Sequence, residues 1–239
     1  MSEKHSRAAV FSSIDSHSPF AEAFRTLRTN LSFAGVDKPY KTILVTSTVP
    51  AEGKSSTTAN LGVVIAQAGQ KVLIIDCDLR KPVQHQNFYL DNAVGVTNCL
   101  VNDLKLDKAI QSTEMAGLDI LTCGPIPPNP AELIGTTKMA ALIAAARDAY
   151  DIVLLDSPPV MTVTDASLLS TMVDGVLLVV KTASTKIELV QETKSLLDRT
   201  NAKIIGVVLN QVDVNGGNYY YYYYYAKDEK KNSIPRAAI

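Results

Sequence analysis

Apolar runs of strand length alternate with longer amphipathic stretches over most of the chain. Six runs rich in Val, Ile and Leu predict β-strands at residues 42–48, 71–76, 118–122, 151–156, 175–181 and 203–210. Stretches with helical spacing predict helices at residues 55–68, 136–150, 163–172 and 186–200. The strands lack polar alternation, which is typical of strands buried on both faces. We therefore predict an α/β protein, with a parallel β-sheet flanked by helices.

The two ends of the chain depart from this alternation. Residues 1–17 are polar and are expected to be mobile, whereas a helix is predicted over residues 18–34 because Pro19 suits a first helical position. Residues 83–117 are less regular and predict short helices beside the sheet. Residues 213–239 break the pattern and predict a flexible tail. The chain is thus expected to hold a single domain over residues 18–212.

The composition argues against a nucleic-acid partner, a disulfide framework and a membrane-spanning segment. The 239 residues carry a net charge of -1, so no overall basic excess points to nucleic acid as a partner. Three cysteines without a CxxC spacing favour a reducing, cytosolic environment over a disulfide framework. No apolar run approaches the ~18–20 residues of a membrane span, and the first residues lack a signal-peptide core. Any membrane association is therefore expected to depend on a partner.

A phosphate-binding loop is the first candidate for chemistry. Residues 48–55 read TVPAEGKS between a predicted strand and a predicted helix, which matches a P-loop with Thr48 in place of the first glycine. Its backbone N–H groups and the helix N-terminus would hold phosphates, with Lys54 on the transferred phosphoryl group and Ser55 on Mg²⁺. The alternative is a chance GKS turn. The predicted ATP-binding residues here are Pro50, Ala51, Glu52, Gly53, Lys54, Ser55 and Ser56.

Ala51 is an unusual residue for such a loop. If the loop needs a positive φ at this position, alanine costs about 1–2 kcal/mol relative to a relaxed backbone. We expect either a negative φ at Ala51 or a tolerated strain of that size.

Acidic residues end two of the predicted strands. Asp76 and Asp78 follow one strand and Asp156 follows another. Ligands of open parallel sheets gather beyond the carboxyl ends of the strands, so all three carboxylates are expected near the phosphate loop. Asp78 and Asp156 are candidate anchors for Mg²⁺, and Asp76 is a candidate proton acceptor. Alternatively, these aspartates only cap strand ends and start turns.

Two further residues are candidate ligands of the nucleotide. Arg80 follows Asp78 and either binds phosphate, contacts a neighbouring subunit or lies in a solvated turn. Asn210 ends the last apolar run and either lies near the adenine or forms a turn.

The predicted tail carries an unbroken tyrosine block. Seven of the ten tyrosines lie there: Tyr219, Tyr220, Tyr221, Tyr222, Tyr223, Tyr224 and Tyr225. Beside a P-loop, the block is interpreted as a set of phosphate acceptors on a flexible segment. The alternative is a low-complexity segment that drives self-association.

Together these motifs resemble the three Walker-type motifs of the bacterial tyrosine kinases, which belong to a group of P-loop NTPases that includes the MinD and ParA types. The segment from Glu22 through Arg25 to Arg28 resembles that family's oligomerisation motif, and residues 125–133 resemble its proline-rich loop. The resemblance covers residues 19–225. The loop has no early lysine, which favours the kinase branch over the partition type.

The resemblance implies an ATP- and Mg²⁺-dependent tyrosine autokinase that modifies its C-terminal tyrosines in trans. It also implies a ring-shaped homo-oligomer, an octamer in the family, together with a transmembrane activator as a separate chain and a cognate tyrosine phosphatase. The implied location is the cytoplasm, at the inner face of the membrane, and the implied role is synthesis and export of capsular or extracellular polysaccharide. Two alternatives are a nucleotide switch of the partition type and a non-enzymatic assembly module of the export machinery.

Overall fold

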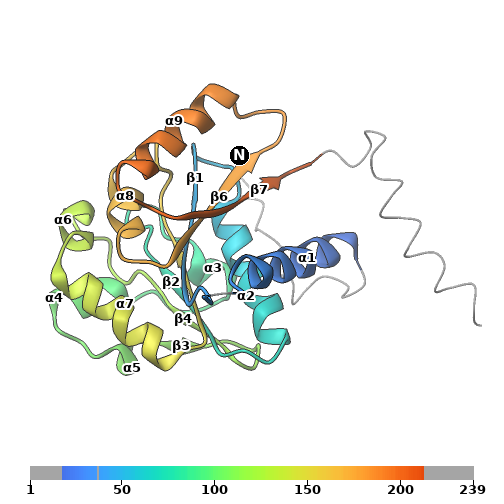
Figure 1. Cartoon of the computed structure of the whole chain (residues 1–239). Helices are drawn as coiled ribbons and strands as arrows, with labels where there is room; N and C mark the ends of the chain where they lie inside the picture. Colours follow the sequence, from blue (N-terminus) through green and yellow to red (C-terminus); the bar gives the residue numbers. More distant parts are fainter. Residues whose placement is uncertain (1–17, 37, 213–239) are drawn as a thin grey trace, which may run out of the picture.

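The computed structural model describes residues 18–36 and 38–212, and its elements alternate along the chain as the sequence predicts (Figure 1). The strands are β1 (Thr42–Ser47), β2 (Val72–Asp76), β3 (Gln111–Ser112), β4 (Leu118–Leu121), β5 (Ile152–Asp156), β6 (Gly175–Lys181) and β7 (Ile204–Asn210). The helices are α1 (Pro19–Ala34), α2 (Lys54–Gln67), α3 (Gln84–Asn87), α4 (Val96–Val101), α5 (Leu106–Ala109), α6 (Pro130–Ile134), α7 (Thr137–Ala149), α8 (Asp165–Ser170) and α9 (Ile187–Asp198).

The strands form one sheet in the order β3-β4-β2-β5-β1-β6-β7. All neighbouring strands are parallel except β3 and β4, which pair antiparallel. Parallel strands end at the same edge of a sheet, so the carboxyl ends of β1, β2 and β5 lie side by side. In the pairing of β2 with β5, Asp76 lies directly opposite Asp156. The register of the sheet therefore brings two of the predicted site residues together.

Helices cover both faces of the sheet and bury its side chains (Figure 1). In β1, Ile43 and Val45 belong to the core under α1 and α2, whereas Leu44 belongs to the core under the helices that follow β2. Because each face has its own apolar layer, the strands read as continuous apolar runs. The predicted α/β fold is confirmed.

Several element boundaries differ from the prediction. The predicted helix over residues 163–172 is shorter and spans α8, and part of the predicted loop over residues 125–133 forms α6. The irregular region 83–117 holds α3, α4 and α5, as expected, and also β3, which was not predicted.

Helix α1 begins at Pro19, and its N-cap Ser18 accepts a hydrogen bond from the backbone N–H of Ala21 at 3.1 Å. Neither α1 nor any other helix of residues 18–36 and 38–212 combines the length and the apolar character that a bilayer crossing needs.

Candidate active site

The loop between β1 and α2 is tied to the sheet by the side chain of Glu52. Its carboxylate accepts hydrogen bonds from the backbone N–H groups of Val49 (2.9 Å) and Lys181 (3.1 Å) and from the hydroxyl of Thr185. Glu52 is buried. Its carboxylate therefore shapes the loop and fastens it to the end of β6, which leaves the backbone of Glu52 as the part that can face a nucleotide.

The loop adopts left-handed backbone conformations at two positions. Gly53 has φ 89°, and a Cβ at this position would lie 2.1 Å from Nδ2 of Asn210, so only glycine fits. Ala51 has φ 65°, so of the two expectations for this residue the strained one holds. The cost is about 1–2 kcal/mol relative to a right-handed conformation. Such strain at a tight loop is common where the backbone must present its N–H groups to a ligand.

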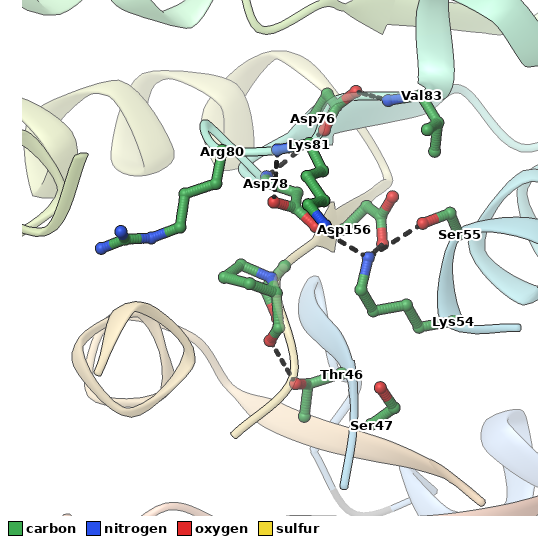
Figure 2. Close-up of polar contacts among 12 residues, drawn as sticks. Thr46, Ser47, Lys54, Ser55, Asp76, Asp78, Arg80, Lys81, Val83 and Asp156 are labelled. Atoms are coloured by element: carbon green, nitrogen blue, oxygen red, sulfur yellow. Dashed lines mark hydrogen bonds and ion pairs between the residues drawn. The ribbon is translucent and has the colours of Figure 1, made fainter. Parts of the chain in front are cut away.

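The loop ends in a lysine that lies between two carboxylates (Figure 2). Nζ of Lys54 donates to Oδ2 of Asp78 at 3.0 Å and to the hydroxyl of Ser55 at 3.0 Å, and it lies 3.7 Å from Oδ1 of Asp156. The side chains of Asp78 and Asp156 are 6% and 0% exposed, so these charges are poorly screened by water. The expected gathering of the acidic strand ends at the phosphate loop is therefore observed.

Asp76 lies behind this pair and is held by the backbone. Its Oδ1 accepts from the N–H of Asp78 at 3.3 Å, and its Oδ2 accepts from Val83 at 3.0 Å and Gln84 at 2.9 Å. The carboxylate thus fixes the loop that follows β2. Burial and the charge of Asp156 raise the pKa of Asp76 to about 8. Its predicted role as a proton acceptor stays a prediction.

Burial and neighbouring charges have opposing effects on the pKa values of Lys54 and Asp156. Burial would lower the pKa of Lys54, but the charges of Asp156 and Asp78 outweigh it and raise that pKa above its ordinary value. Burial likewise raises the pKa of Asp156, although Lys54 opposes the shift. Lys54 is therefore firmly cationic at neutral pH. A cationic amine in a buried carboxylate cluster suits the binding of phosphoryl oxygens.

The donor set also fits a hard cation. Oδ1 of Asp156 is buried and has no hydrogen-bond partner among the described residues, and it lies on the same side as the hydroxyl of Ser55. Within residues 18–36 and 38–212, no group of three or more His, Cys, Asp or Glu side chains forms a metal cage. Mg²⁺ commonly takes one or two carboxylates and completes its shell with water and phosphate oxygens, so this set is sufficient.

Sequence reasoning missed one residue of the site. Gln84, at the start of α3, is fully buried, and its amide donates to Oδ2 of Asp156 at 2.7 Å. A glutamine outside any recognised motif carries no chemical signal in the sequence. It lies eight residues after Asp76, in a segment that returns toward the sheet, and only the folded chain brings it to the site.

Other candidate residues have partners within the chain. Arg80 forms two hydrogen bonds with Asp165, at 2.9 and 3.0 Å, and its guanidinium points away from Lys54 in Figure 2. A role of Arg80 in nucleotide binding stays a prediction. The amide of Asn210 donates to the backbone carbonyl of Glu52 at 2.8 Å, which places Asn210 against the phosphate loop. Its predicted contact with the adenine stays a prediction too.

The residues of the predicted oligomerisation motif lie on α1. Arg25 pairs with Glu22 at 2.8 Å on the exposed side, whereas Arg28 reaches α2 and donates to the backbone carbonyl of Val64 at 3.0 Å. Arg28 therefore supports the packing of α1 on α2 in addition to any contact between subunits. The predicted acceptors at residues 219–225 lie outside the described residues.

Comparisons with known proteins identify the family. Residues 40–205 match the AAA domain family. The chain is 45% identical to tyrosine-protein kinase YwqD of Bacillus subtilis over 190 residues. The aligned region covers 80% of this chain and 80% of YwqD. The chain belongs to the bacterial tyrosine-protein kinase family. The tyrosine kinase resemblance is thereby confirmed, and the kinase interpretation is favoured over the nucleotide switch and the assembly module.

Solved structures agree with this assignment. The chimerical protein CapA2B2 is 44% identical to this tyrosine kinase, with a TM-score of 0.79 over 85% of this chain and 92% of that chain. The septum site-determining protein MinD of Pyrococcus horikoshii is 24% identical over 71% of this chain and 69% of that chain, with a TM-score of 0.61, and shares the fold. The predicted P-loop NTPase fold of the MinD type is confirmed. The matches to the AAA domain family and to a tyrosine-protein kinase support the use of a nucleotide.

Proposed function

We propose that this chain is an ATP-dependent protein tyrosine autokinase that phosphorylates its C-terminal tyrosines, residues 219–225, in a neighbouring copy. The observation that carries the proposal is the placement of Lys54 between Asp78 and Asp156 at the end of a strained phosphate loop. Phosphoryl transfer requires positioning and charge neutralisation more than covalent chemistry, and this cluster provides both.

Each residue of the cluster has a proposed role. The loop backbone from Pro50 to Ser56 holds the phosphates, and Lys54 neutralises charge on the phosphoryl group as it moves. Ser55, Asp78 and Asp156 would hold Mg²⁺, directly or through water, and the ion would supply positive charge that offsets the charge of the phosphates. Asp76, in its ionised form, accepts the proton of the attacking tyrosine hydroxyl; because its pKa of about 8 leaves that form in the minority at neutral pH, this step should quicken as pH rises through about 8.

The start of the tail supports transfer between subunits. Asn210 ends β7 against the phosphate loop, and Tyr219 and Tyr225 lie nine and fifteen residues further along the sequence. At ~3.3 Å per extended residue these tyrosines reach about 30–50 Å from Asn210. A tether of this length brings them to the site of an adjacent copy at a high effective concentration.

The family resemblance supports the wider assembly. We propose a ring-shaped homo-oligomer formed through Glu22, Arg25 and Arg28, an octamer by resemblance. A transmembrane activator on a separate chain would keep it at the inner face of the membrane, and a cognate tyrosine phosphatase would reverse the modification. The proposed role is regulation of capsular or extracellular polysaccharide synthesis and export.

Mass spectrometry after incubation with Mg-ATP tests the proposal. The wild type and Lys54→Met are compared, each with and without the cytosolic piece of an activator. Trypsin releases all seven tail tyrosines on one peptide, residues 204–227, and places Tyr150 on another. The hydroxyl of Tyr150 is hydrogen-bonded to Asp119 at 2.8 Å, which makes Tyr150 an internal negative control.

We expect phosphate on the tail peptide of the wild type with the activator, and none in Lys54→Met. A wild type that binds the nucleotide and hydrolyses it, yet leaves the tail unmodified with the activator present, would instead support the nucleotide switch.

A further inference from the structure

The side chain of Gln84 joins three parts of the site that are distant in the sequence. Its Nε2 donates to Oδ2 of Asp156 at 2.7 Å, at the end of β5, and to the backbone carbonyl of Ser55 at 3.1 Å, in the first turn of α2. Its Oε1 accepts from Asn87 at 3.2 Å. The residue is 0% exposed. A buried amide is costly unless its groups are paired, and here each of its polar atoms has a partner.

This arrangement decides which oxygen of Asp156 is available. Gln84 occupies Oδ2, whereas Oδ1 has no hydrogen bond among the described residues and lies 3.7 Å from Nζ of Lys54. A carboxylate with one oxygen fixed from behind cannot rotate without losing that bond. Gln84 therefore directs Oδ1 of Asp156 toward the side on which Lys54 and Ser55 lie (Figure 2).

The backbone of Gln84 contributes to the same framework. Its N–H donates to Oδ2 of Asp76 at 2.9 Å, so one residue contacts the carboxylates at the ends of both β2 and β5. These two aspartates are direct neighbours in the sheet. The side-chain bond to Ser55 then ties the pair to α2, which carries the lysine and the hydroxyl of the phosphate loop.

We propose that Gln84 is a positioning residue that presents Oδ1 of Asp156 to the divalent cation accompanying the nucleotide. The inference rests on the proposed function, because it requires a metal–nucleotide complex at the phosphate loop. Residues that orient a metal-binding carboxylate from behind commonly change metal affinity 10- to 100-fold when they are replaced. The effect should fall on the metal-dependent part of nucleotide binding and spare the part carried by the loop backbone.

Calorimetric titration of the full chain with ADP, at a series of Mg²⁺ concentrations and in EDTA, tests the proposal. Gln84→Met has a similar volume and cannot donate to Asp156. We expect this variant to need at least about tenfold more Mg²⁺ than the wild type for half of the Mg²⁺-dependent gain in ADP affinity. Its affinity for ADP in EDTA should stay within about twofold of the wild type, because the loop backbone is unchanged.

Two further variants make the result decisive. Gln86→Met changes an exposed glutamine of the same short helix and should behave as the wild type in both conditions. Gln84→Leu also removes the donor to Asp156 and introduces no ionisable group, so it should show the same Mg²⁺-specific loss. It carries the test if Gln84→Met does not fold, as judged by its circular dichroism spectrum and melting curve.

The outcomes separate this inference from the proposed function. An equal loss of ADP affinity with and without Mg²⁺ would show a structural role for Gln84 and overturn the inference, as would an unchanged response to Mg²⁺. In both cases the wild type still binds Mg-ADP, so the kinase proposal survives. A wild type whose ADP affinity does not respond to Mg²⁺ would overturn both.

Discussion

The side-chain amide of Asn210 donates a hydrogen bond of 2.8 Å to the backbone carbonyl of Glu52. The last residue of β7 is thereby fastened to the phosphate loop, and Nδ2 of Asn210 fills the space that a side chain at Gly53 would need. The carboxylate of Glu52 fastens the same loop to β6 through the N–H of Lys181. The shape of the loop therefore depends on the two strands that lead to the C-terminal tyrosines.

Removing this contact should weaken nucleotide binding. Asn210→Ala loses one hydrogen bond to the loop, worth about 1 kcal/mol, so we expect roughly fivefold weaker ADP binding by calorimetry. Gln191→Ala, on the exposed surface of α9, serves as the control and should bind as the wild type does. An Asn210→Ala variant with undiminished ADP affinity would mean that the loop keeps its shape without β7.

Replacing the strained alanine should stabilise the protein. Ala51 has φ 65°, and glycine removes a penalty of about 1–2 kcal/mol while adding about 0.5–1 kcal/mol of backbone entropy to the unfolded chain. We expect Ala51→Gly to raise the free energy of unfolding in urea by about 0.5–1 kcal/mol. Ala144→Gly, exposed within α7, should lower it by about 1 kcal/mol. If both variants changed the free energy of unfolding in the same direction, the proposed strain at Ala51 would be contradicted.

The raised pKa of Asp76 predicts how stability depends on pH. The folded protein keeps the proton of Asp76 up to about pH 8, whereas the unfolded chain releases it near the ordinary pKa of 3.8. Between these values the unfolded state binds fewer protons, so the contribution of Asp76 to stability is complete below about 3.8 and is lost as pH rises through about 8.

Urea unfolding of Asp76→Asn and the wild type at pH 5.5 and 8.5 checks this sign. The variant, which has no such proton, should gain stability relative to the wild type at the higher pH. Asp148→Asn, at an exposed position of α7, should show no such trend. A relative loss for Asp76→Asn at pH 8.5 would mean that the pKa is not raised.

Arg28 should matter to the stability of the single subunit as well as to the proposed oligomer. Its bond to the carbonyl of Val64 is partly buried, so Arg28→Ala should lower the free energy of unfolding by about 1–2 kcal/mol. Glu22→Ala removes only an exposed pair with Arg25, worth about 0–1 kcal/mol.

Replacement of Glu22, Arg25 and Arg28 together should yield monomers by light scattering. A triple variant that stays oligomeric would rule out this face of α1 as the interface.

Phosphorylation of the tail should loosen the proposed oligomer. Each phosphotyrosine adds about -1.5 to -2 charges, and several on neighbouring tails repel one another. We expect the mass by light scattering to fall after incubation with Mg-ATP, and high salt to reduce that fall through screening. Fully modified tails in an assembly of unchanged mass would refute this expectation.

The sequence predicted the elements whose pattern is local. The buried strands and α2 are apolar or periodic in themselves, and the acidic ends of β2 and β5 converge because parallel strands share an edge. Strand β3 was missed because Gln111–Ser112 is a polar two-residue pairing with no alternation to detect. The order of the strands likewise depends on packing between distant segments, which no local pattern encodes.

The same limit applies within the site. Lys54, Asp78 and Asp156 were found because their residue types fit phosphate chemistry at recognised positions. Gln84 is chemically ordinary, and its contact with Asp156 spans 72 positions of sequence. Arg80 illustrates the opposite case, because its place beside Asp78 suggested a phosphate ligand although its guanidinium is engaged by buried Asp165 on α8.

The direction of β7 has a consequence for how a substrate segment can be attached to this fold. Because β7 runs parallel to β6, and β6 to β1, the chain emerges at the edge where the phosphate loop begins. An antiparallel last strand of seven residues would release the chain at the opposite rim, roughly 20 Å away, on the far side of its own protomer. A connection longer by about that distance would then be needed to bring an acceptor back to the edge of the sheet that holds the phosphate loop. The parallel direction of β7 relative to β6 thus shortens the acceptor segment that this fold needs.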